Sequence, residues 1–222
     1  MLHKTRGVVF RFTRYGETSI IVTIFTEAFG LQTYMVNGVR SKTSKNKIAL
    51  YQPLTLLDLV VYHKEHASIL RIKELKCLYP YQTIGTDVHK STIALFLNEI
   101  LNKTVKEESH AGDLCQFLID ALTTLDQMKT GVENFHLSFL ILLSRHLGFG
   151  PQRAEEILGG RLLSEPEEKI LQEMIDADYR VPFALTNTQR RNILDTLLHF
   201  YAVHIETMGE IKSVQVLREV LG

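Results

Sequence analysis

The chain has few of the residues that mark a metal, membrane or secreted protein. Its 222 residues include two cysteines, Cys77 and Cys115, and no tryptophan. The two cysteines form no CxxC pair and cannot supply a four-cysteine zinc site. So few cysteines are typical of a protein in a reducing cytoplasm. No apolar run reaches the roughly 18 residues that a membrane span needs, and the N-terminus lacks a signal peptide's apolar core and cleavage site. We therefore expect a cytoplasmic protein without a membrane partner.

Motifs of catalysis and cofactor binding are also missing. The sequence contains no GxxxxGK[ST] loop, no GxSxG elbow and no HExxH pair. Asp176 and Asp178 could together bind a cation, as in a metal-dependent nuclease, but the solvated end of a helix is the simpler explanation for both. We therefore expect no enzymatic activity, no bound metal and no cofactor.

A net charge of zero conceals a strong asymmetry between the two halves. Residues 1–80 carry 12 Lys and Arg against 5 Asp and Glu, which gives +7, and residues 81–222 carry 13 against 20, which gives −7. Such asymmetry indicates two domains with different partners. A basic half favours a polyanion such as nucleic acid, although chance segregation of surface charge remains the alternative.

Alternating apolar residues at 5–13, a nearly continuous β-branched run at 20–25 and three further apolar segments predict five short strands within residues 1–80 and no helix between them. The expected ranges are 5–13, 20–25, 31–36, 54–62 and 68–75. Five such strands indicate a small β-barrel, and a five-stranded OB-fold that binds single-stranded nucleic acid is one candidate. An SH3-like barrel fits the same pattern.

Helical spacing of apolar residues begins after Pro80, near a junction at residues 79–86. It predicts helices over 87–105, around Leu114–Met128 and over 135–147, the last apolar on all sides and so central. Ser164 with Glu167, and Thr186 with Gln189, have capping-box spacing before two further helices. A short helix around 214–221 ends the chain, so residues 81–222 are expected to form an all-α domain.

A basic loop stands between the third and fourth expected strands. Arg40, Lys42, Lys45 and Lys47 lie close together within residues 38–53, separated by Ser, Thr and Asn and by no carboxylate. Lys and Arg supply charge, and the polar residues supply neutral hydrogen-bond donors, which together suit phosphate. A solvated hairpin tip is the alternative interpretation.

Other basic residues of the first half alternate with aromatic ones. Charge that follows a phosphate backbone and rings that stack on bases are the usual means of binding single strands. Rings within a barrel are more often part of its core. The candidates are Arg6, Arg11 and Arg14 for phosphate, with Tyr15, Tyr34 and Tyr51 for bases.

Several segments together resemble RecO, a bacterial family of recombination mediators and repair proteins. The N-terminal signature is carried by YGETSIIVTIFTEAFG and by GVRSKTSKNKIALYQPLTLL. FLNEIL at 96–101, HLGFGP at 146–151 and the terminal IKSVQVLREVL match in the same order. The resemblance implies an N-terminal OB-fold and a C-terminal helical domain. It also implies binding to single- and double-stranded DNA, annealing of strands and help in loading RecA, with RecR and the single-strand-binding protein SSB as partners, near the nucleoid.

The chain departs from this family at one place. Many members carry four cysteines in the helical domain and bind zinc, but residues 151–185 here contain no cysteine. The segment is instead rich in acidic residues. We expect it to fold without metal or to have become a plain helical connection.

The acidic half is better suited to protein partners than to DNA. The resemblance points to the C-terminal tail of SSB, which is acidic and ends in an apolar residue. Binding such a tail needs cations beside an apolar slot, and Arg145, Arg190 and Arg191 are the candidates. They could instead pair with carboxylates of their own domain. The alternative function for the whole chain is an OB-fold adaptor that binds acidic proteins and has no direct role on DNA.

Overall fold

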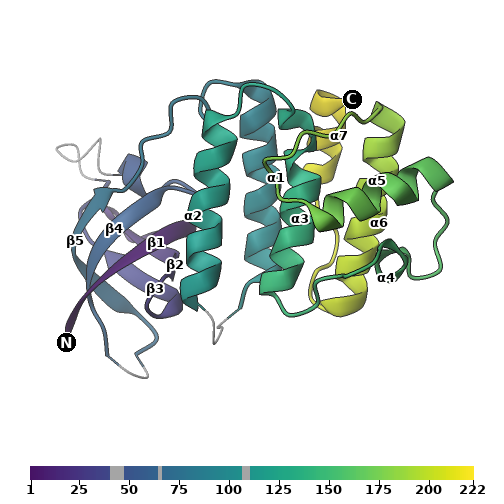
Figure 1. The fold of residues 1–222 in the computed structure, drawn as a ribbon. Helices are drawn as coiled ribbons and strands as arrows, with labels where there is room; N and C mark the ends of the chain where they lie inside the picture. The colour runs from purple at the N-terminus through teal and green to yellow at the C-terminus, as the bar shows by residue number, and fades with distance from the viewer. Residues whose placement is uncertain (41–47, 65–66, 107–110) are drawn as a thin grey trace. The chain divides into compact units, whose positions relative to one another are not determined.

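The computed structural model describes residues 1–40, 48–64, 67–106 and 111–222 (Figure 1). The chain divides into two compact units. The first contains residues 1–81 and also residues 105–123, and the second contains residues 82–104 and 124–222. Residues 105–123 therefore group with the strands, although the sequence analysis placed them in the helical domain.

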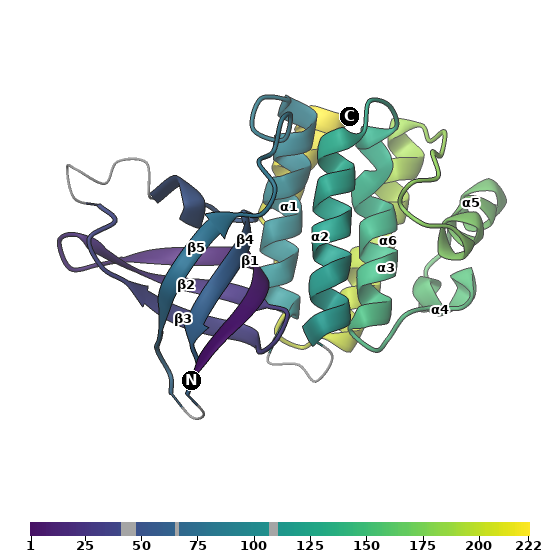
Figure 2. The same ribbon diagram turned by 60° about the vertical axis from the view of Figure 1, so that its left-hand side comes forward.

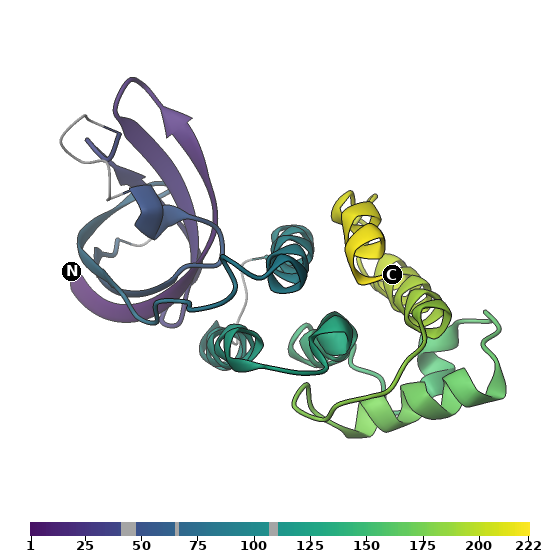
Figure 3. The same cartoon turned by 90° about the horizontal axis from the view of Figure 1, so that it is seen from above.

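The first unit is built on five strands that close into a barrel (Figure 3). The strands are β1 (Leu2–Tyr15), β2 (Ser19–Thr26), β3 (Gly30–Val36), β4 (Leu56–Tyr62) and β5 (Leu70–Cys77). Their order around the barrel is β1-β2-β3-β5-β4, with β1 pairing to both β2 and β4 and with β3 parallel to β5. This is the OB-fold topology, so the predicted OB-fold is confirmed over the SH3-like alternative.

Alternation along the strands divides inward from outward residues. Val22, Ile24 and Tyr34 belong to the core inside the barrel, together with Tyr51 of a short 3-10 helix (Ile48–Tyr51). Tyr34 and Tyr51 are 0% and 2% exposed, so neither ring can stack on a nucleic-acid base. Burial raises the pKa of both phenols, that of Tyr51 to about 12. The expectation that these two rings serve as base platforms is therefore wrong.

The second unit is helical, as predicted from the spacing of its apolar residues (Figure 2). The helices of the chain are α1 (Val88–Thr104), α2 (Ala111–Gln127), α3 (Phe135–His146), α4 (Ala154–Leu158), α5 (Glu165–Asp176), α6 (Asn187–His204) and α7 (Ser213–Leu221). A 3-10 turn (Val132–Asn134) precedes α3. Nine of the twelve residues of α3 are buried, which confirms its central position. The capping boxes at Ser164 and Thr186 both form.

A buried carboxylate fixes the entry into α1. Asp126, near the end of α2, accepts hydrogen bonds from the backbone N–H groups of Gln82, Thr83 and Ile84. Lys90, only 3% exposed, donates its Nζ to the Asp126 carbonyl and to the Thr83 hydroxyl, each at 2.7 Å. These bonds satisfy polar groups that would otherwise be buried without partners.

Candidate nucleic-acid interface

The strand register gathers a set of outward side chains on one side of the barrel. Arg11 pairs with Thr23 and Thr23 with Thr33, while Ile21 pairs with both Thr13 and Met35. Met35 in turn pairs with Arg71 of β5. Val22, Tyr34 and Leu70, which adjoin members of this set in sequence, belong to the core. We call this set the strand face. Its members are Arg11, Thr13, Ile21, Thr23, Thr33, Met35 and Arg71.

Two arginines of the strand face lie at its opposite sides. Arg11 on β1 and Arg71 on β5 are both exposed, and β2 and β3 lie between them. Neighbouring strands are about 4.8 Å apart, so three steps separate the two backbones by about 14 Å along the sheet. None of the members of the strand face is acidic. Cations on either side of a polar and apolar floor suit a nucleic-acid strand that crosses the sheet.

The structure separates Arg14 from Arg11. Arg14 pairs with Ile20, which belongs to the barrel core, so Arg14 stands at the rim of the barrel and outside the strand face. Arg40 binds the turn between β1 and β2, where its Nη1 donates to the Gly16 carbonyl at 3.1 Å. Gly16 has φ of 56°, a left-handed conformation that favours glycine. Both arginines thus lie near this turn, one of the loops with which OB-folds bind oligonucleotides.

Lys42, Lys45 and Lys47, the remaining candidates of the basic loop, lie outside the described residues. Their role in binding phosphate stays a prediction from the sequence.

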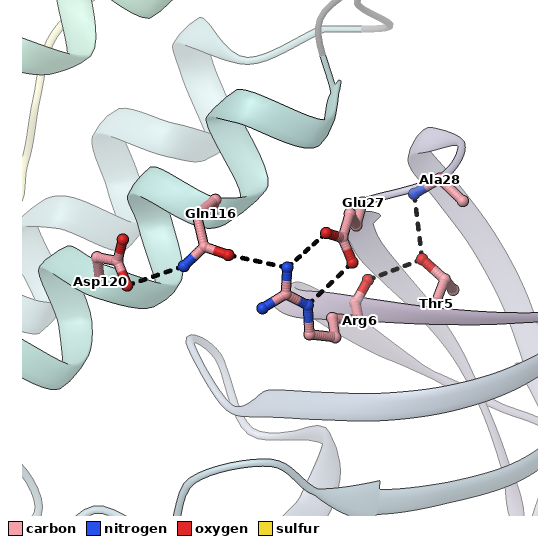
Figure 4. Close-up of polar contacts among 6 residues, drawn as sticks. All are labelled: Thr5, Arg6, Glu27, Ala28, Gln116 and Asp120. Carbon is pink, nitrogen blue, oxygen red and sulfur yellow. Dashed lines mark hydrogen bonds and ion pairs between the residues drawn. The ribbon is translucent and has the colours of Figure 1, made fainter.

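Arg6 is held by partners within its own unit (Figure 4). Its guanidinium binds both oxygens of Glu27, with Nε to Oε2 at 2.9 Å, and donates to Oε1 of Gln116 at 2.8 Å. Gln116 in turn donates to Asp120 on α2. The hydrogen bond from Arg6 lowers the pKa of Glu27 below its usual value. Arg6 therefore ties β1 to α2, and its role as a phosphate ligand stays a prediction from the sequence.

Two candidates on the barrel surface could not be found from sequence periodicity alone. Arg71 lies in the predicted fifth strand, but only its pairing with Met35 places it beside β3. Tyr62 lies in the predicted fourth strand, but periodicity alone does not show that it faces outward. The residue is 48% exposed. Tyr15, the third sequence candidate, is 52% exposed at the end of β1.

Family models and curated relatives agree on the ancestry of the chain. The model for the N-terminal domain of recombination protein O matches residues 1–81, and the model for its C-terminal domain matches residues 85–167. The chain belongs to the RecO family. It is 34% identical over 235 residues to the DNA repair protein RecO of Flavobacterium johnsoniae, covering 99% of each chain. The RecO of Phocaeicola vulgatus is 30% identical over 241 residues, covering 100% of each.

In this RecO-family chain, the three arginines proposed for partner binding have different surroundings. Arg190 is buried and donates to Asn134 and Asn187 side chains and to the Leu221 carbonyl. Burial lowers the pKa of its guanidinium. Arg145 is exposed and donates to the carbonyl of Ile175 at the end of α5. These partners are neutral carbonyl and amide oxygens, and among the described residues neither arginine forms the carboxylate pair considered as an alternative.

Arg191 lies in an open groove between the start of α6 and α7. The groove has a volume of about 730 Å³ and is lined by cations, carboxylates and apolar side chains. Its cations are Arg191, Lys212 and Arg218, and its apolar members include Ile211 and Val214. Arg218 also pairs with Asp195. Of the three predicted arginines, only Arg191 lines this groove. Arg218 lies on α7 and Lys212 directly precedes it. Helical spacing does not show that α7 lies beside α6, so these two residues could not be predicted as part of the groove.

The cysteine-free segment is held together by hydrogen bonds and apolar contacts. Glu167, 5% exposed, accepts from the Ser164 backbone N–H and hydroxyl and from the Asn192 amide of α6. Gln172 accepts from the Ala154 N–H at the start of α4. Within the described ranges, no group of three or more His, Cys, Asp or Glu residues could hold a metal ion.

The two aspartates of the nuclease alternative have other contacts. Asp176 accepts from the Gln172 amide at 3.3 Å, and Asp178 accepts from the Arg180 backbone N–H at 2.6 Å. These contacts favour the solvated helix end over a cation site. In the part of the chain that the structure describes, no helix has the length and apolar character needed to cross a bilayer.

We predict that chelation leaves the protein folded. Excess EDTA should not change the melting temperature followed by circular dichroism, because Gln172 joins α5 to α4 and Glu167 joins α5 to α6 without a metal ion. Metal analysis of the purified protein serves as the control. Stoichiometric zinc that is lost together with helical structure would contradict the prediction.

Proposed function

We propose that this chain is a non-catalytic recombination mediator in DNA repair. It binds single- and double-stranded DNA, anneals complementary strands and, with RecR, helps to load RecA on DNA coated by SSB. Membership in the RecO family supports the repair role. The observation that carries direct DNA binding is the strand face, where two exposed arginines flank neutral residues on an OB-fold.

The chemistry of the strand face favours a nucleic acid over an acidic protein. A phosphate backbone offers evenly spaced charges, and cations that neutralise it release counterions. The hydroxyls of exposed Thr13 and half-buried Thr33 supply neutral donors and acceptors beside the arginines. An acidic protein would need apolar side chains that fit the apolar residues of the strand face. A nucleic-acid strand can bind to such a face in several positions along its length.

The basic loop is expected to add to this affinity. Replacing Lys42, Lys45 and Lys47 with alanine should reduce the slope of log K against log salt by about two to three units, since each lost phosphate contact contributes about 0.7–0.9. Mobility shifts with single- and double-stranded oligonucleotides at several salt concentrations would measure this slope.

A matched control for the loop replaces Lys129 and Lys169, two exposed lysines of the helical unit. Their loss should leave the slope unchanged. If the loop variant also keeps the wild-type slope, the phosphate contacts lie elsewhere, with Arg11, Arg14 and Arg40 next. If the wild-type protein binds neither DNA, the adaptor function with acidic protein partners takes precedence.

The helical unit has a different proposed partner, the acidic tail of SSB. The groove between α6 and α7 supports it, because Arg191, Lys212 and Arg218 stand beside Ile211 and Val214. Cations can pair the carboxylates of the tail while the apolar residues receive its end. We propose RecR as a further partner and assign it no residues.

A further inference from the structure

A path of outward residues winds around the barrel. Starting from Thr13, each member is the register partner of the next on the neighbouring strand. The path crosses all five strands and comes back to β1 at Leu2, eleven residues from its start, so it does not close into a ring. We call this set the belt. Its members are Thr13, Ile21, Met35, Arg71, Tyr62 and Leu2.

The belt contains two exposed apolar side chains that stand next to each other. Tyr62 and Leu2 are 48% and 44% exposed and stand next to each other across β4 and β1. Tyr62 points outward because its neighbour Val61 lies in the core. Ile21 and Met35 on the other side of Arg71 are partly exposed. The belt therefore consists of two apolar patches with one arginine between them.

We propose that the belt receives the unpaired bases of a single strand, with Tyr62 as a stacking residue and Arg71 as the adjacent phosphate ligand. This inference rests on the proposed function and adds to it a means of telling single strands from duplex. Arg71 is the direct partner of Tyr62 on the neighbouring strand, so a base on the ring brings its phosphate towards the guanidinium.

The chemistry of the belt selects for bases rather than for a backbone alone. A duplex keeps the faces of its bases stacked inside, so Tyr62 cannot reach them. A single strand exposes those faces, and stacking on an aromatic side chain stabilises the complex for every base type. Arg71 adds charge that either form of DNA can use. The apolar patches therefore favour single strands, while the arginines bind both.

The chain offers a control away from the candidate interface. Leu95 on α1 of the helical unit is 52% exposed, close to the exposure of Tyr62. Leu95→Ala removes exposed apolar surface that lies outside the belt and carries no aromatic ring. The effect of Tyr62→Ala beyond that of Leu95→Ala reports the belt.

The test is fluorescence anisotropy with a labelled oligo-dT and a labelled duplex at several salt concentrations. Tyr62→Ala should weaken oligo-dT binding by about 5- to 150-fold, the range for one stacked base. Duplex binding and the salt slope should stay near wild type, because no phosphate contact is lost. Tyr62→Phe keeps the ring and should restore the affinity.

Two outcomes would overturn the inference. One is an unchanged affinity of Tyr62→Ala for oligo-dT, and the other is an equal loss for oligo-dT and duplex. If Tyr62→Ala melts early, Tyr62→Leu keeps apolar volume without a ring and decides the same question. A different result would contradict the proposed function itself, namely wild-type protein that binds neither oligo-dT nor the duplex.

Discussion

Replacing Asp126 with alanine is expected to lower the free energy of unfolding by about 4 kcal/mol. The carboxylate is 2% exposed and accepts from three consecutive backbone N–H groups, those of residues 82–84, and from the Thr83 hydroxyl. Alanine removes this acceptor from donors that are buried at Ile84 and partly buried at residues 82 and 83, and an unsatisfied buried group costs about 1–3 kcal/mol. The segment at residues 82–84 can relax and expose its N–H groups to water, so the total loss of stability stays below the sum of the individual costs.

Urea denaturation followed by circular dichroism would measure the loss from Asp126→Ala. Asp126→Asn keeps one oxygen acceptor and should fall between the alanine variant and wild type. Asp113→Ala, at an exposed site in the first turn of the same helix, should cost about 0.5 kcal/mol through the helix dipole alone. Similar losses for Asp113 and Asp126 would show that the bonds to residues 82–84 do not stabilise the fold.

Replacing Arg190 with alanine is expected to cost about 3 kcal/mol of stability, whereas Arg191→Ala should cost less than about 0.5 kcal/mol. Arg190 is buried, and its loss leaves the Asn134 side chain and the Leu221 carbonyl without their donor. Arg191 is exposed in the groove. The two residues are neighbours in sequence, so the pair separates a structural arginine from one that is proposed for binding.

Binding of a labelled SSB tail peptide should show the opposite order. Arg191→Ala should weaken the peptide by about two- to fivefold, the size of one partly exposed charged contact. Arg190→Ala, measured below its melting temperature, should retain the affinity if the groove keeps its shape. Unchanged affinity in Arg191→Ala, Lys212→Ala and Arg218→Ala would exclude the groove as the tail site.

The elements that depend on local chemistry were predictable from the chain. Helical spacing located α3, and the capping boxes at Ser164 and Thr186 marked the starts of α5 and α6. Alternation of apolar and polar residues located the first strand, and short apolar runs bounded by turns located the other four. The short helix α4 was missed because five residues are too few to show a period.

Which charged and aromatic side chains remain available for binding was decided by partners far along the chain. Arg6 lies in an alternating strand, but Glu27 and Gln116, the latter 110 residues away, occupy its guanidinium. Tyr34 and Tyr62 both sit in alternating strands, yet one fills the core and the other is exposed. Strand periodicity says that neighbours face opposite sides and leaves open which side is the interior.

The sequence by itself thus determined the barrel, the helical half and the excess of cations in the first 80 residues. Their arrangement into a face was decided by strand register, which sets Arg71 beside Met35 and Tyr62. Register depends on pairing between residues that no local pattern connects. The same holds for Arg190 and Arg191, since a step of about 100° around α6 turns one into the core and the other into the groove.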